Sequence, residues 1–149
     1  MVMISELLSN DRIRIFSAHD KDEALKELLR LLSSADAIGD VGELERAIFE
    51  RESIMSTSIG LGIAIPHVRL ETVSEMCMAI GVLKEGIDYQ AFDDQQVRII
   101  IMIAAPAGTH RQYLSLLAKL ALLLKNPVIR DAILTAQDPM QVFDILRDH

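Results

Sequence analysis

The sequence predicts an α/β sandwich, in which helices cover both faces of a central sheet. Two long apolar runs rich in β-branched residues, at positions 76–83 and 97–105, are typical of central strands buried on both faces. Residues 12–16 alternate between charged and apolar side chains, which predicts a further strand. Segments with helical periodicity lie before, between and after these strands, so the simplest packing places helices on both sides of one sheet.

Two helices in the first half of the chain begin with recognisable capping pairs. In each pair, an aspartate that can cap a helix is followed three residues later by a glutamate. The pairs are Asp20/Glu23 and Asp40/Glu43. The first helix should extend to residue 34, with an apolar stripe between Ala24 and Leu32, and the second should end near residues 51–54.

The last third of the chain is predicted to be helical. Thr109 with Gln112 forms another capping-box pair, which should start a long helix. Two shorter helices should follow, because each is preceded by a cap residue and a first-turn proline. These starts are Asn126-Pro127 and Asp138-Pro139.

Length and composition indicate one cytoplasmic domain spanning residues 1–149. Half of the residues are hydrophobic but only 4% are aromatic, so the core must be mainly aliphatic. The net charge of -7 argues against partners such as nucleic acids or anionic membrane surfaces. We see no signal peptide and no apolar segment near the roughly 20 residues of a membrane helix, so we expect at most a peripheral link to a membrane transporter. The single cysteine, Cys77, excludes an internal disulfide and is expected in the core.

The stretch from Ser56 to Leu70 contains the residue best suited to chemistry, His67. Gly60 and Gly62 predict a tight turn, and the apolar residues 63–65 predict a short buried strand. Pro66 fixes its own φ and lacks an amide donor, so regular strand pairing should fail there and present His67 at a strand end. An imidazole in this setting could serve as a base, a metal ligand or a nucleophile.

The segment IGLGIAIPH, residues 59–67, resembles the signature of the type-2 EIIA domains of the bacterial phosphotransferase system. The resemblance covers nearly the whole chain and continues in four flanking segments. These are Arg51-Glu52, Ser56-Thr57, Gly108-Thr109-His110 and Leu114-Ser115-Leu116. It implies a three-layer α/β sandwich with a mixed parallel and antiparallel sheet. It also implies that the histidine after the proline, His67, accepts a phosphoryl group from the phosphohistidine carrier HPr or a relative.

The same resemblance suggests which residues surround the phosphate. Arg51 precedes His67 by 16 residues, as the family's phosphate-facing arginine does, and a guanidinium can grip two phosphate oxygens at once. His110 lies where a family histidine faces the phosphorylated one, at the expected N-terminus of a helix. Thr57, or Ser56 beside it, could donate a hydroxyl to the phosphate or to His67, or could cap a turn.

One position departs from the family pattern. The family has glycine after the histidine, and this chain has Val68 followed by Arg69. If the backbone stays extended, Val68 points into the core while His67 and Arg69 share the opposite face. Arg69 could then add a cation near the phosphate, or it could simply be a surface charge.

Three functions remain open at this point. The first is a phosphohistidine carrier between an HPr-like donor and either an EIIB-type acceptor or a regulated protein, in sugar transport or nitrogen regulation. The second is a regulatory binding module that responds to its phosphorylation state, or a degenerate relative that is not phosphorylated. The third, a metal protein built on His67 and His110, is disfavoured because no third ligand has metal-site spacing. Phosphoryl transfer to an imidazole requires no cofactor if the protein supplies the donors.

Overall fold

Residues 3–149, which the computed structural model describes, form six strands, six α-helices and one short 3-10 helix. In chain order the elements are α1 (Ile4–Leu7), η1 (Asn10–Arg12), β1 (Ile13–Phe16), α2 (Lys21–Leu32), α3 (Val41–Ile54), β2 (Ser58–Gly60), β3 (Ile63–Ala64), β4 (His67–Leu70), β5 (Cys77–Ile87), β6 (Val97–Pro106), α4 (His110–Lys125), α5 (Pro127–Thr135) and α6 (Pro139–Leu146).

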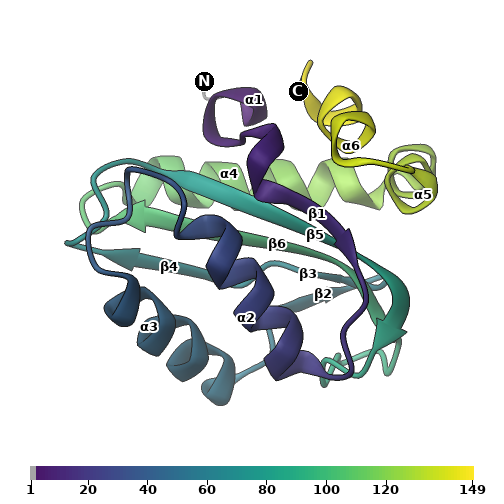
Figure 1. Cartoon of the computed structure of the whole chain (residues 1–149), viewed down its shortest axis with the longest axis horizontal. Helices are drawn as coiled ribbons and strands as arrows, with labels where there is room; N and C mark the ends of the chain where they lie inside the picture. The colour runs from purple at the N-terminus through teal and green to yellow at the C-terminus, as the bar shows by residue number, and fades with distance from the viewer. Residues whose placement is uncertain (1–2) are drawn as a thin grey trace.

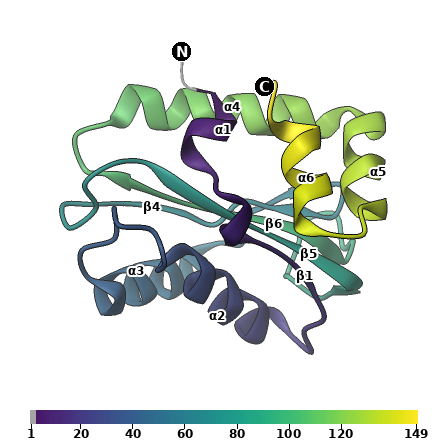
Figure 2. The same cartoon turned by 45° about the horizontal axis from the view of Figure 1, so that its top comes forward.

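The sheet lies between two layers of helices, which confirms the predicted sandwich. Figure 1 shows α2 and α3 against one face of the sheet, and in Figure 2 α1, α4, α5 and α6 cover the other face. Two separate clusters of buried apolar side chains fill the two interfaces. Among the helices of residues 3–149, none has the length and hydrophobicity that crossing a bilayer requires.

The sheet is mixed, as the family resemblance implies. Its order is β1-β5-β6-β3-β2, and β4 pairs with β6 beyond the end of β3. β5 and β6 run antiparallel at the centre, and β1 pairs with β5 in parallel. β3 and β4 both run parallel to β6, one after the other, and β2 returns antiparallel to β3. The two long central strands are those predicted from the apolar runs, although β5 continues to Ile87.

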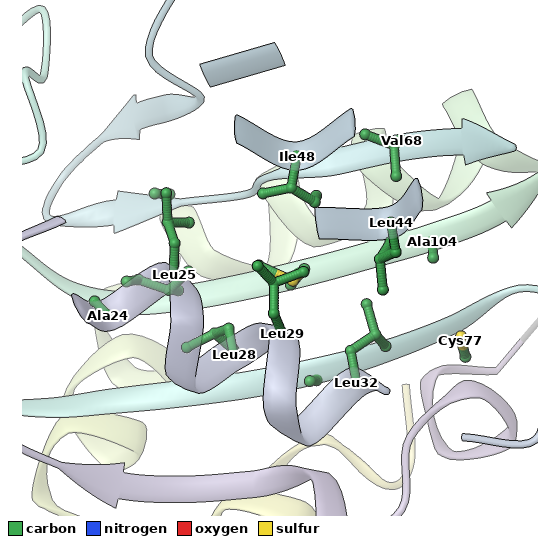
Figure 3. Close-up of a cluster of buried hydrophobic side chains, with 14 of the residues drawn as sticks. Ala24, Leu25, Leu28, Leu29, Leu32, Leu44, Ile48, Val68, Cys77 and Ala104 are labelled. Atoms are coloured by element: carbon green, nitrogen blue, oxygen red, sulfur yellow. The ribbon is translucent and has the colours of Figure 1, made fainter. Parts of the chain in front are cut away.

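The α2 and α3 face shows how the helical stripe meets the sheet. Figure 3 shows the α2 leucines and two α3 side chains, Leu44 and Ile48, packed over the strands beside Val68. The predicted apolar stripe of α2 is confirmed, because all five of its members are buried. They are Ala24, Leu25, Leu28, Leu29 and Leu32. Full burial of one such leucine side chain stabilises the fold by about 1.5–3 kcal/mol. Cys77 lies in the same core, where burial raises the pKa of its thiol to about 11.

Four of the five predicted helix caps form as expected. The side chains of Asp20, Asp40, Asn126 and Asp138 each accept a hydrogen bond from a first-turn amide. The prediction for Thr109 is wrong, because its hydroxyl turns back and donates to the Pro106 carbonyl at 2.8 Å instead of capping α4. α4 nevertheless begins at His110, the residue expected to start it.

Candidate functional site

A break between two short strands positions His67. β3 ends at Ala64 and β4 begins at His67, so His67 starts a new strand at the break instead of ending one. Pro66 has no amide to donate, but its carbonyl accepts a hydrogen bond from the Ile103 amide at 2.9 Å, which keeps the chain aligned along β6. The predicted turn before β3 is present, with φ of 85° at Gly60 and 77° at Gly62.

His67 lines an open cavity of about 500 Å³ at the edge of the sheet. The other lining residues come from the end of α3, from β4, from the segment after β6 and from the first turns of α4. They are Ala47, Arg51, Val68, Arg69, Leu70, Ala107 and Tyr113. The cavity thus combines one imidazole, two guanidinium groups and one phenol.

A backbone hydrogen bond fixes the protonation pattern of the His67 ring. Nδ1 lies 2.5 Å from the carbonyl oxygen of Ile65. Because a carbonyl oxygen can only accept, Nδ1 carries the proton, and in the neutral ring the lone pair is on Nε2. Burial is the main cause that lowers the pKa of His67. The charge of Arg51 lowers it too, whereas the Ile65 hydrogen bond and the charge of Glu52 oppose this shift. The ring is therefore neutral at pH 7.

Strand alternation along β4 is as predicted. Val68 is buried in the core beneath α2 and α3, whereas His67 and Arg69 lie on the side of α4. Both of these side chains contact Tyr113. The centroids of the His67 and Tyr113 rings are 5.6 Å apart at an interplanar angle of 58°, and Arg69 Cζ lies 5.3 Å from the Tyr113 centroid.

Arg51 approaches the cavity from the last turn of α3. Its Nη1 donates to the Met55 carbonyl at 2.8 Å, which holds the side chain at the helix end. A guanidinium has five N–H donors, so most remain available to an anion. The three residues Arg51, His67 and Tyr113 line the same cavity. The charge of Arg51 adds to the lowering of the pKa of His67 that burial causes, and it partly offsets the rise that burial causes in the pKa of Tyr113.

Thr57 does not line the cavity, contrary to the expected contact with phosphate. It is 5% exposed, and its hydroxyl donates to the carboxylate of Glu52, whose other oxygen accepts from the Thr57 amide at 3.3 Å. Glu52 is also buried and pairs with Lys21 at 3.0 Å. The Thr57 hydroxyl is therefore hydrogen-bonded to the buried Glu52 carboxylate, and this bond stabilises the turn after α3. Ser56, the alternative, donates to the Tyr89 carbonyl at 2.9 Å.

The structure does not bring His110 into the cavity either. His110 is exposed at the first position of α4, whereas Tyr113, one turn along the same helix, is buried and meets the ring of His67. Tyr113 was not among the site residues predicted from the sequence. A usable signal was present, since Tyr113 is one of only two tyrosines in the chain and follows His110 by one helical turn.

The described residues contain no cluster of side chains suited to binding a metal ion. Within residues 3–149, no group of three or more His, Cys, Asp or Glu side chains is arranged to hold a metal ion. The cavity itself places a neutral imidazole beside two arginines, which suits an anion that reacts with nitrogen.

A match to a family model identifies the family to which this chain belongs. Residues 6–149 match the model described as the phosphoenolpyruvate-dependent sugar phosphotransferase system, EIIA 2. The chain belongs to the EIIA 2 family. This confirms the resemblance drawn from the segment around His67.

Relatives of this EIIA 2 chain carry both sugar-related and regulatory names. It is 33% identical over 86% of its length to a fructose-specific EIIA component of Haloferax volcanii, covering 83% of that protein. It is 30% identical over 96% of its length to a nitrogen regulatory protein of Bradyrhizobium diazoefficiens, covering 94% of that protein. A fructose-specific EIIABC component of Bacillus subtilis is 35% identical, but the chain spans only 23% of its length.

Solved structures share the fold. The crystal structure of the nitrogen regulatory protein IIA-Ntr from Neisseria meningitidis has a TM-score of 0.88 at 26% identity, with 96% of this chain and 98% of that chain covered. IIA mannitol from Escherichia coli has a TM-score of 0.78 at 23% identity, over 93% of this chain and 98% of that chain.

Proposed function

We propose that this EIIA domain is a phosphohistidine carrier, which accepts a phosphoryl group on Nε2 of His67 and passes it on or signals by it. The observation that carries the proposal is the state of the imidazole. Nδ1 is tied to the Ile65 carbonyl, and the lowered pKa keeps the ring neutral, so the Nε2 lone pair is the available nucleophile. Family membership adds support, because the family model describes a phosphotransferase component.

The proposed transfer moves one phosphoryl group between two imidazoles. The nitrogen–phosphorus bond of the donor breaks, and its electron pair returns to the donor ring. A new bond forms from Nε2 of His67 to phosphorus. Because Nδ1 keeps its proton, positive charge develops on the His67 ring, and the Ile65 carbonyl oxygen at 2.5 Å stabilises it.

The cations around the cavity would bind the phosphoryl oxygens. Arg51 and Arg69 line the same cavity as His67 from two different elements, so they can approach the phosphoryl group from two directions. Fixed donors aimed at the transferring group are the main catalytic aid that phosphoryl transfer requires. Thr57 would not contact the phosphoryl group. Its role would be indirect, because its two hydrogen bonds to Glu52 stabilise the turn that follows Arg51.

The partners follow from the same chemistry. We expect an HPr-like phosphohistidine protein as the donor, and several relatives are named multiphosphoryl transfer protein. The acceptor would be an EIIB-type domain or a regulated protein, since relatives include both fructose-specific and nitrogen regulatory proteins. In keeping with this, one solved structure of the same fold is a complex of IIA mannitol with phosphorylated IIB mannitol from Escherichia coli.

Incubation with a phosphorylated HPr-type donor tests the proposal. The protein should gain one phosphoryl group by intact mass spectrometry, and the label should be lost in mild acid, as expected of a phosphoramidate. Failure to gain the label from any HPr-type donor, in a protein that still binds such a donor, would favour the alternative of a pure binding module.

A further inference from the structure

Tyr113 has a hydroxyl whose partner is not found within the fold. The side chain is 7% exposed and lines the cavity, yet its hydroxyl makes no hydrogen bond with any residue from 3 to 149. Although most of the side chain is buried, the hydroxyl oxygen is not among the buried unpaired polar atoms, so it is open to a ligand in the cavity. Arg51 and Arg69 line the same cavity, and the charges of both act on the phenol.

The ring of Tyr113 also organises its neighbours. One part of the ring contacts His67, and Arg69 lies over it at 5.3 Å. Arg69 is an exposed arginine at a strand edge, where its long side chain would otherwise sample many rotamers. A cation–π contact with a buried ring restricts that sampling and keeps the guanidinium near His67.

We propose that Tyr113 completes the phosphoryl site of this chain in two ways: its hydroxyl donates a hydrogen bond to a phosphoryl oxygen on His67, and its ring positions Arg69. The inference rests on the proposed carrier function and deepens it. The family resemblance implies a second histidine facing the first, but here the facing ring is a phenol. Tyr113 can donate, because burial raises its pKa to about 12 and keeps it protonated, but it cannot take up a proton as histidine does.

Two variants separate the hydroxyl from the ring. Tyr113→Phe keeps the ring and removes only the donor, and should slow single-turnover transfer from a phosphorylated HPr-type donor by about 10- to 100-fold, as for one hydrogen bond to a charged group. Tyr113→Leu removes both and should be slower still. Arg147→Ala is the charge-matched control for Arg69→Ala, because Arg147 is an exposed arginine at the C-cap of α6, a helix that contacts the opposite edge strand β1.

The ring's effect on Arg69 is tested by non-additivity. In the Tyr113→Phe background, where the ring remains, Arg69→Ala should slow transfer by the same factor as in the wild type. In the Tyr113→Leu background, Arg69→Ala should slow transfer only slightly further. A purely structural role for Tyr113 would instead give equal effects of Arg69→Ala in both backgrounds, and that result overturns the ring's part of the proposal. Wild-type transfer rates in Tyr113→Phe overturn the hydroxyl's part.

A donor-free measurement distinguishes this inference from the proposed function. Inorganic phosphate is titrated into the protein while the ring resonances of His67 and Tyr113 are followed by NMR. Weaker phosphate binding by Tyr113→Phe and Arg69→Ala than by Arg147→Ala supports the site even if no donor phosphorylates the protein. Equal shifts in all variants, or no shift in the wild type, overturn it.

Discussion

Replacing Arg51 by alanine should separate phosphate binding from folding. Arg51 lines the cavity with His67, and the one hydrogen bond that its side chain makes within residues 3–149 is the exposed one to the Met55 carbonyl. Loss of one preorganised donor to a developing oxyanion typically slows catalysis by about 100- to 1000-fold. Since Arg69 remains in the cavity to compensate in part, we expect Arg51→Ala to slow transfer by roughly 10- to 1000-fold.

The cost to stability should be small by comparison. One exposed hydrogen bond contributes about 1 kcal/mol to the free energy of unfolding. For a chain of this length, that corresponds to a fall in Tm of about 2–4 °C. The variant should also raise the pKa of His67, because the charge of Arg51 is one of the causes that lower it.

Three measurements together check this prediction. Stopped-flow transfer from a phosphorylated HPr-type donor gives the rate, thermal unfolding gives Tm, and an NMR titration of the His67 ring gives its pKa. Arg147→Ala serves as the distant control. A large loss of Tm with normal transfer would assign Arg51 a structural role and refute the argument.

Three further predictions concern buried groups. Glu52→Ala should lower the free energy of unfolding by about 3–5 kcal/mol in urea denaturation, because it leaves Lys21 and Thr57 without their buried partner; a loss below 1 kcal/mol would show that the network is not stabilising. Because folding lowers the pKa of His67, only the unfolded chain binds a proton just below pH 6.5, so stability should fall as the pH falls through that window. His67→Gln should lack this component, and an unchanged pH dependence would contradict it. Cys77 has a pKa of about 11 against the usual 9.0, so it should form about 100-fold less thiolate than a free cysteine. It should therefore react far more slowly with a thiol reagent, and rapid labelling of the folded protein would contradict this.

The parts of the fold that local patterns determine could be predicted from the sequence. The caps at Asp20 and Asp40 act within one helical turn, so residue spacing alone identifies them. The opposite orientations of Val68 and Arg69 follow from the period of two along any strand. The short strands β2 and β4 were not separately predicted. Segments of three or four residues carry little periodicity. In addition, β4 pairs with β6, and the paired residues lie more than 30 positions apart in the chain.

The parts of the site that depend on tertiary packing could not be predicted. The family resemblance of the Ser56-Thr57 segment suggests a hydroxyl that binds phosphate, but Thr57 is hydrogen-bonded to Glu52. Glu52 is a buried acidic residue, and residues of this type usually lie at the surface. His110 occupies the helix start as expected, yet the way α4 packs on the sheet brings Tyr113 to His67 instead. Such choices depend on helix packing, which sequence spacing does not determine.

The central claim is that Nε2 of His67 carries the phosphoryl group, and NMR of the phosphorylated protein tests it most directly. Protein with ¹⁵N-labelled histidine is phosphorylated by an HPr-type donor, and the coupling between phosphorus and the ring nitrogens identifies the bonded atom. We predict coupling to Nε2 of His67 with the proton retained on Nδ1, because the Ile65 carbonyl occupies Nδ1. Phosphorus bonded to Nδ1 of His67 or to another histidine would contradict the account. Undiminished phosphorylation of the His67→Ala variant would contradict it as well.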